Sequence, residues 1–189
     1  MKAKELRLSG IQNNKFGVLN YYKRILMLLT GFILFVKPFA GIASHHKREI
    51  RSEIIINATP DRVWKVLTDF GDYPSWNPFL KWLKGNVAIK NRIEVRIEPP
   101  GASGMTFKPR VLKFDTNKEF RWLGHLIIPG LFDGEHIFEL IDNGDGTTTF
   151  VQREIFGGIL IPFFKKMLEI NTRQGYEQMN KALKERAEK

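Results

Sequence analysis

The chain has 189 residues, a formal net charge of +10 and no cysteine. With 43% hydrophobic and 12% aromatic residues, it can bury one sizeable core and has little room for a second. The lack of cysteine excludes disulfides, thiolate zinc sites, iron–sulfur clusters and cysteine nucleophiles.

The positive charge is concentrated at the N-terminus. Residues 1–43 contain seven Lys or Arg and a single acid, a net charge of +6, whereas residues 44–189 carry only +4 with mixed signs. A domain with that balance has an ordinary soluble surface, and no basic helix with interleaved aromatic residues is present. We therefore expect no nucleic-acid partner.

An uncharged apolar run spans residues 25–36 and follows Lys23 and Arg24. Twelve helical residues rise only ~18 Å, less than the ~30 Å hydrocarbon core of a bilayer. The length suits a signal peptide cleaved before Ser44, and an uncleaved, tilted anchor over 25–43 is the alternative. Residues 1–43 thus predict a protein that is exported to the periplasm or anchored in the inner membrane. A buried N-terminal helix in a cytoplasmic protein is the remaining possibility.

Residues 44–50 are expected to be a linker, and residues 51–187 a single domain. The first predicted elements are a strand at 52–58 and a helix at 60–69, with Thr59 as its N-cap and Pro60 in its first turn. Six further strands and a long helix follow, at 82–89, 92–98, 105–114, 119–127, 132–141, 147–156 and 162–187. This order predicts an α+β fold in which an antiparallel sheet has its helices on one side.

Strand alternation sorts the side chains into faces. His136 shares a face with Phe138, and Gln152 shares one with Glu154. If the aromatic face is concave, a cavity with the following walls and polar groups is predicted. The aromatic walls are Trp76, Phe79, Phe107, Trp122, Phe138, Phe150 and Phe156, and the polar groups are Asn77, His136, Gln152, Glu154 and Asn171. In particular, Trp122 and Phe138 should line one cavity beneath the last helix.

The last helix places Asn171 and Gly175 in the middle of its apolar face. A glycine inside a helix costs ~1 kcal/mol relative to alanine, so its position needs an explanation. Either the helix packs closely on the sheet at this point, or both residues face the cavity. The residues of the elbow at 73–79 leave the same choice between core and ligand contact open.

Several motifs in this domain match a known pattern. They are Val63-Trp64, Tyr73-Pro74-x-Trp76-Asn77-Pro78-Phe79, Arg121-Trp122-x-Gly124, Gly134-Glu135-His136-x-Phe138 and Gln152-Arg153-Glu154-x-Phe156. Over 51–187 the chain resembles the bacterial polyketide cyclase/dehydrase-like branch of the START-like (SRPBCC, birch-pollen-allergen-like) superfamily. The resemblance implies a helix-grip fold, in which a seven-stranded antiparallel sheet curves around a long C-terminal helix and encloses a cavity for apolar molecules.

Fold and pocket alone do not specify a reaction. The leading hypothesis is binding or transport of a hydrophobic, lipid-like small molecule. An alternative is a polyketide cyclase or aromatase in which His136 is the general base and Glu154 orients it. A stress or assembly factor is a third. We expect no cofactor and no metal site, since His45-His46 has no third ligand nearby.

Overall fold

The computed structural model describes residues 47–189. Its elements are β1 (Arg48–Ile56), α2 (Pro60–Thr68), α3 (Tyr73–Trp76), β2 (Leu80–Lys84), β3 (Glu94–Ile97), β4 (Met105–Phe107), β5 (Arg110–Asp115), β6 (Glu119–His125), β7 (Asp133–Asp142), β8 (Thr148–Gly157), α4 (Ile161–Met167), η1 (Leu168–Thr172) and α5 (Arg173–Ala187). The predictions for residues 1–43 and for cleavage before Ser44 lie outside the described residues. The predicted linker 44–50 ends too late, because β1 already begins at Arg48.

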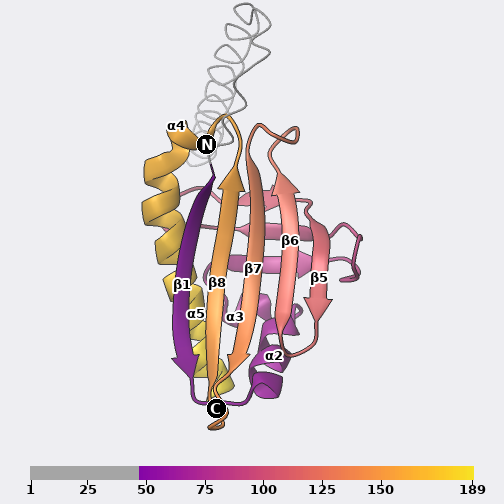
Figure 1. Cartoon of the computed structure of the whole chain (residues 1–189), viewed down its shortest axis with the longest axis vertical. Coiled ribbons are helices and arrows are strands. Elements are labelled where there is room, and N and C mark those ends of the chain that lie inside the picture. Colours follow the sequence, from indigo (N-terminus) through magenta and orange to yellow (C-terminus); the bar gives the residue numbers. More distant parts are fainter. Residues whose placement is uncertain (1–46) are drawn as a thin grey trace, which may run out of the picture. The chain divides into compact units, whose positions relative to one another are not determined.

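The α+β class and the fully antiparallel pairing are confirmed, but the prediction of one seven-stranded sheet is wrong. The strands form a five-stranded sheet in the order β1-β8-β7-β6-β5 and a three-stranded sheet in the order β2-β3-β4. Figure 1 shows the smaller sheet, magenta to pink, crossing behind the larger one. The predicted strand 105–114 divides at Pro109, which has no N–H to donate to a ladder. One isolated bridge, Arg92 to Arg110, joins the two sheets.

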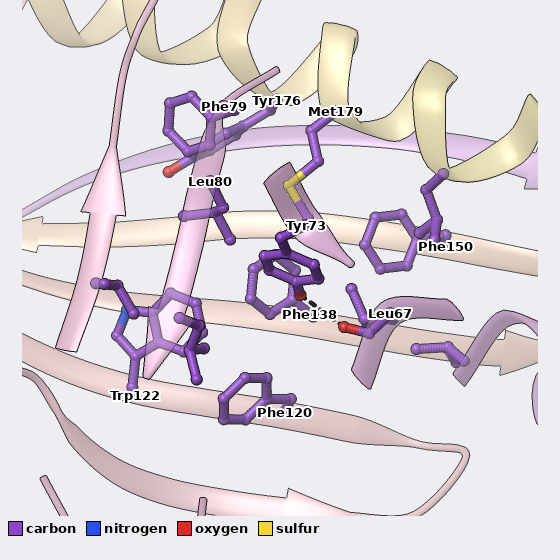
Figure 2. Close-up of a cluster of buried hydrophobic side chains, with 14 of the residues drawn as sticks. Leu67, Tyr73, Phe79, Leu80, Phe120, Trp122, Phe138, Phe150, Tyr176 and Met179 are labelled. Carbon is purple, nitrogen blue, oxygen red and sulfur yellow. Dashed lines mark hydrogen bonds between the residues drawn. The ribbon is translucent and has the colours of Figure 1, made fainter. Parts of the chain in front are cut away.

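The elbow that follows α2 belongs to the core. Thr59 caps α2 with its side chain, as expected. Tyr73 is fully buried, and its hydroxyl donates a 2.6 Å hydrogen bond to the carbonyl of Leu67 (Figure 2). Burial, with a smaller contribution from Asp69, raises the pKa of Tyr73 well above its ordinary value. The elbow therefore packs into the hydrophobic core at one end of the domain.

The C-terminal helix is interrupted by the π-helical segment η1, between α4 and α5. A π turn takes more residues than an α turn, so it shifts the buried stripe around the helix axis. After the interruption, the buried stripe includes Thr172, Tyr176, Met179 and Leu183. Figure 1 shows α4 and α5 along one edge of the larger sheet. Within residues 47–189, no helix is long and apolar enough to span a bilayer.

Candidate functional site

A cavity of about 130 Å³ lies between the two sheets and the π-helical segment. Its lining comes from β3, β4, β6, β7, β8, η1 and the loops next to them. The residues are Phe79, Val95, Ile97, Pro99, Ala102, Ser103, Met105, Phe107, Pro109, Trp122, Gly124, His125, Leu126, Phe132, Gly134, Glu154, Phe156, Leu168 and Thr172. Three lining residues, Ala102, Ser103 and Met105, are exposed to solvent. The cavity therefore opens to solvent at the loop between β3 and β4.

The cavity walls are mainly apolar. Trp122 and Phe156 are buried on the larger sheet, and Phe107 is half-buried on the smaller one. Phe132 continues this wall by packing on Phe156, with ring centroids 5.6 Å apart. An apolar wall of this kind favours a ligand with little polar surface.

Glu154 is the only carboxylate among the described residues that line the cavity. The Tyr176 hydroxyl donates a 2.5 Å hydrogen bond to its Oε2. The other oxygen, Oε1, lies over Gly134, so close that a Cβ at this position would collide with it. Gly134 therefore makes room for the carboxylate on the neighbouring strand, which explains why a glycine occupies this point of β7.

His136 and Gln152 lie behind Glu154, and both are fully buried. The Nδ1 of His136 is 3.5 Å from Glu154 Oε2, and its Nε2 is 3.1 Å from the side-chain nitrogen of Gln152. If the Gln152 amide donates to Nε2, the histidine carries its proton on Nδ1, on the side of the carboxylate. Glu154 thus lines the cavity, whereas His136 does not and lies behind the carboxylate.

Tyr176 completes this polar cluster. Burial raises the pKa of its hydroxyl well above the ordinary value, and the nearby charge and hydrogen bond of Glu154 raise it further. The phenol therefore stays protonated and acts as a hydrogen-bond donor to Glu154. The cluster offers the cavity a carboxylate that is held in place from behind.

Five of the predicted cavity residues line the cavity: Phe79, Phe107, Trp122, Glu154 and Phe156. Phe138 and Phe150 do not, because they pack into the filled core, 6.1 Å apart and stacked (Figure 2). The expectation that Phe138 shares a cavity with Trp122 is therefore not met. Trp76 packs edge-on against Tyr73, with ring centroids 5.4 Å apart.

The remaining predicted residues have local structural partners. Asn77 accepts backbone hydrogen bonds from Phe79 and Leu80 through its Oδ1, at 3.0 and 2.8 Å. Asn171 donates to the carbonyl of Pro100 at 2.7 Å and so ties the helix to the loop at the cavity opening. Gly175 allows close packing, since a Cβ there would collide with the Phe79 ring.

The sequence interpretation missed Tyr176 and Thr172. A regular helical wheel starting from Phe164 places Asn171 and Gly175 at the centre of the inward face, whereas the helix with its π turn also buries Thr172 and Tyr176, next to a Gly175 that packs on Phe79. A signal was present, because Thr172, Tyr176, Met179 and Leu183 follow helical spacing by themselves. A wheel that starts from the C-terminal end of the helix would have found it.

Solved structures share this architecture. The Zhui aromatase/cyclase from Streptomyces sp. R1128 has a TM-score of 0.61 at 16% identity, over 76% of this chain and 94% of that one. Norcoclaurine synthase from Thalictrum flavum has a TM-score of 0.60 at 15% identity, over 77% and 97%. A START superfamily protein from Mycobacterium smegmatis has a TM-score of 0.57 at 19% identity, over 77% and 98%. These similarities confirm the helix-grip fold.

No curated protein sequence matches the chain. The sequence profile of one family, however, matches residues 47–188, which is most of the chain and nearly all of the described domain. The expected family resemblance is thereby confirmed. The chain belongs to the family described as polyketide cyclase / dehydrase and lipid transport.

Proposed function

We propose that the domain binds an apolar small molecule that carries one hydrogen-bond donor, and holds it in the cavity between the two sheets. The observation that carries the proposal is the single carboxylate, Glu154, in an otherwise largely apolar wall. An ionised carboxylate only accepts hydrogen bonds, so a hydroxyl or an amine on the ligand is its natural partner.

The cavity volume limits the part of the ligand that is enclosed. An apolar cavity of ~150 Å³ holds benzene, so about 130 Å³ accommodates one ring or a short branched chain. A longer molecule extends through the opening beside Ala102 and Met105. This arrangement suits a carrier that encloses one end of a lipid-like molecule.

Titration with 2-naphthol, an aromatic alcohol, tests the proposal. We expect saturable binding to the full chain, and loss of binding in Gly124→Leu. Gly124 lines the cavity, and a Cβ there meets only Pro109, at 3.7 Å, so the added leucine enters the cavity. Gly157→Leu is the matched control, because no atom lies within 4 Å of a Cβ at this position and Gly157 is not part of the lining.

Glu154→Gln tests the polar half of the proposal. The amide keeps the shape of the side chain but removes the charge, so 2-naphthol should bind roughly tenfold more weakly. Equal affinity in the wild type and in Gly124→Leu would contradict binding in this cavity. Loss in Gly124→Leu with no change in Glu154→Gln would contradict recognition of the ligand's donor by the carboxylate.

A cyclase is the second candidate function, and the cluster around Glu154 is the observation that favours it. A carboxylate beside an apolar cavity can accept a proton from an activated carbon, while the hydrogen bond from the Tyr176 hydroxyl holds it in position. General-base catalysis contributes ~10²–10⁴-fold. Incubation with a linear poly-β-ketone, followed by mass spectrometry, should then show ring closure in the wild type and almost none in Glu154→Gln.

A further inference from the structure

Four large apolar side chains are exposed together at one end of the domain. Ile127 and Ile128 lie in the β6–β7 loop, and Ile159 and Phe163 lie at and just before the start of α4. The two segments are joined by backbone hydrogen bonds from Ile159 to Gly130 and from Leu160 to Leu131, at 3.1 and 3.0 Å. Figure 1 places both at the end of the molecule where β1 begins.

The backbone of Ile127 is strained, and the side chain points into solvent. Its φ is +67°, and the N–H of Ile128 donates to the carbonyl of Leu126 at 2.9 Å, which closes a γ-turn centred on Ile127. Positive φ is unfavourable for a β-branched residue, and this type of γ-turn is rare and strained. Even so, 72% of the Ile127 surface is exposed to solvent. Strain that presents an apolar group to water indicates a binding role.

Charge at this end is positive. Lys165 and Lys166 lie in the last turn of α4, next to Phe163, and no carboxylate among residues 47–189 pairs with either lysine. Acidic groups nearby already have partners: Glu169 pairs with Arg48, and Asp133 pairs with His125 at 2.7 Å. Exposed apolar side chains bordered by unpaired lysines match the interface of an anionic bilayer.

We propose that these six residues, Ile127, Ile128, Ile159, Phe163, Lys165 and Lys166, form a docking surface for an anionic lipid bilayer. The surface borders the cavity, because Leu126 and Phe132, at the two ends of the loop that carries Ile127, both line it. Docking places this side of the cavity next to the lipid phase, which shortens the path of an apolar ligand between cavity and bilayer. This role rests on the proposed binding function, while the docking itself is measured separately from it.

The sequence before the domain is compatible with this orientation. Ten residues, 37–46, separate the apolar run 25–36 from the first described residue. They span at most ~35 Å when fully extended. β1, the first strand of the domain, starts at the end that carries the docking surface (Figure 1).

Single-cysteine labelling tests docking in the full chain, which has no cysteine of its own. Ile159→Cys places an environment-sensitive fluorophore on the docking surface, and Ile55→Cys, also at an exposed isoleucine, places one near the end of β1, away from it. With vesicles of phosphatidylcholine and phosphatidylglycerol, the label at 159 should shift to the blue and be quenched by quenchers within the bilayer. The label at 55 should change little.

Each other outcome overturns the proposal. Unchanged emission at 159 on vesicles that bind the chain means attachment through other residues alone. A label at 159 that is already shielded before vesicles are added means that another protein segment or a second copy covers the surface. Binding of 2-naphthol is measured on the same samples, so failure of docking and failure of ligand binding are told apart.

Two variants separate docking from folding. Ile127→Gly relieves the positive φ, so Tm should not fall, while the emission shift of the label at 159 should weaken. Lys165→Gln and Lys166→Gln should each raise the amount of anionic lipid needed for half-maximal shift, by roughly fivefold. If Ile127→Gly or the lysine variants leave the shift unchanged, the bilayer does not contact these residues.

Discussion

The two ends of the domain differ in how they use aromatic residues. At the end formed by α2 and α3, the rings of Tyr73, Phe120 and Phe138 are fully buried and fill the space between helix and sheet (Figure 2). At the end formed by η1 and the loops, the rings of Phe107 and Phe132 border a cavity of about 130 Å³. Similar residue types thus provide stability at one end and a binding wall at the other, and the substitutions below exploit this contrast.

The largest contrast concerns two phenylalanines. Phe138→Ala opens a void in a filled core and should lower the free energy of unfolding by about 3–5 kcal/mol. Phe107→Ala removes a half-buried ring that already borders empty space, and should cost less than about 2 kcal/mol. Urea unfolding of both variants measures the difference, and equal losses would show that the two ends are packed alike.

Two glycines provide a second contrast, of intermediate size. Gly175→Ala improves helix propensity by ~1 kcal/mol but drives a methyl group into the Phe79 ring, so a net loss of about 1–2 kcal/mol is expected. Gly124→Ala adds a methyl group that makes only an ordinary contact in the cavity, and its stability should stay within ~0.5 kcal/mol of the wild type. A stabilised Gly175→Ala would mean that helix and sheet do not pack closely there.

The smallest effect concerns a carboxylate on β6 of the filled end. Burial alone would raise the pKa of Glu119, but hydrogen bonds from Lys113 at 2.8 Å and Arg121 at 2.6 Å outweigh it and lower this pKa. Because the folded-state pKa lies below the unfolded one, the stabilisation is present above the unfolded pKa of ~4.3 and is lost as pH falls through the folded value.

Glu119→Gln should therefore cost about 1 kcal/mol at pH 7 and much less at pH 3. Thermal unfolding at both pH values measures this. Glu135→Gln serves as the control, because Glu135 contacts the same Arg121 at 2.9 Å but lacks the Lys113 contact. A cost for Glu119→Gln that does not change with pH would contradict the ionic origin of the effect.

The sequence was sufficient for the class of fold and for much of the cavity wall. Alternation placed Trp122 and Phe156 on the inward face because strand geometry fixes side-chain direction every second residue. Alternation could not distinguish Phe138 from Trp122, because their rings lie on the same face with centroids 5.1 Å apart. Which ring packs into the core and which borders the cavity depends on the curvature of the sheet.

Two local irregularities account for the other differences. Pro109 divides a predicted strand and produces two sheets where one was expected. The π turn at Leu168–Thr172 precedes Tyr176, which reaches Glu154 beside the inward-facing Gly175, whereas a regular wheel centres the inward face on Asn171 and Gly175 alone. Both depend on tertiary packing, which a periodicity argument does not include.

The most direct measurement of the central claim is native mass spectrometry of the full chain purified from its own host. Wild type and Gly157→Leu should carry an additional mass that organic solvent extracts as a molecule with an apolar body and a hydroxyl or amine. Gly124→Leu, with its cavity filled, should lack that mass. An extracted molecule that is present equally in all three proteins, or no bound mass together with no 2-naphthol binding, would contradict a ligand site in this cavity.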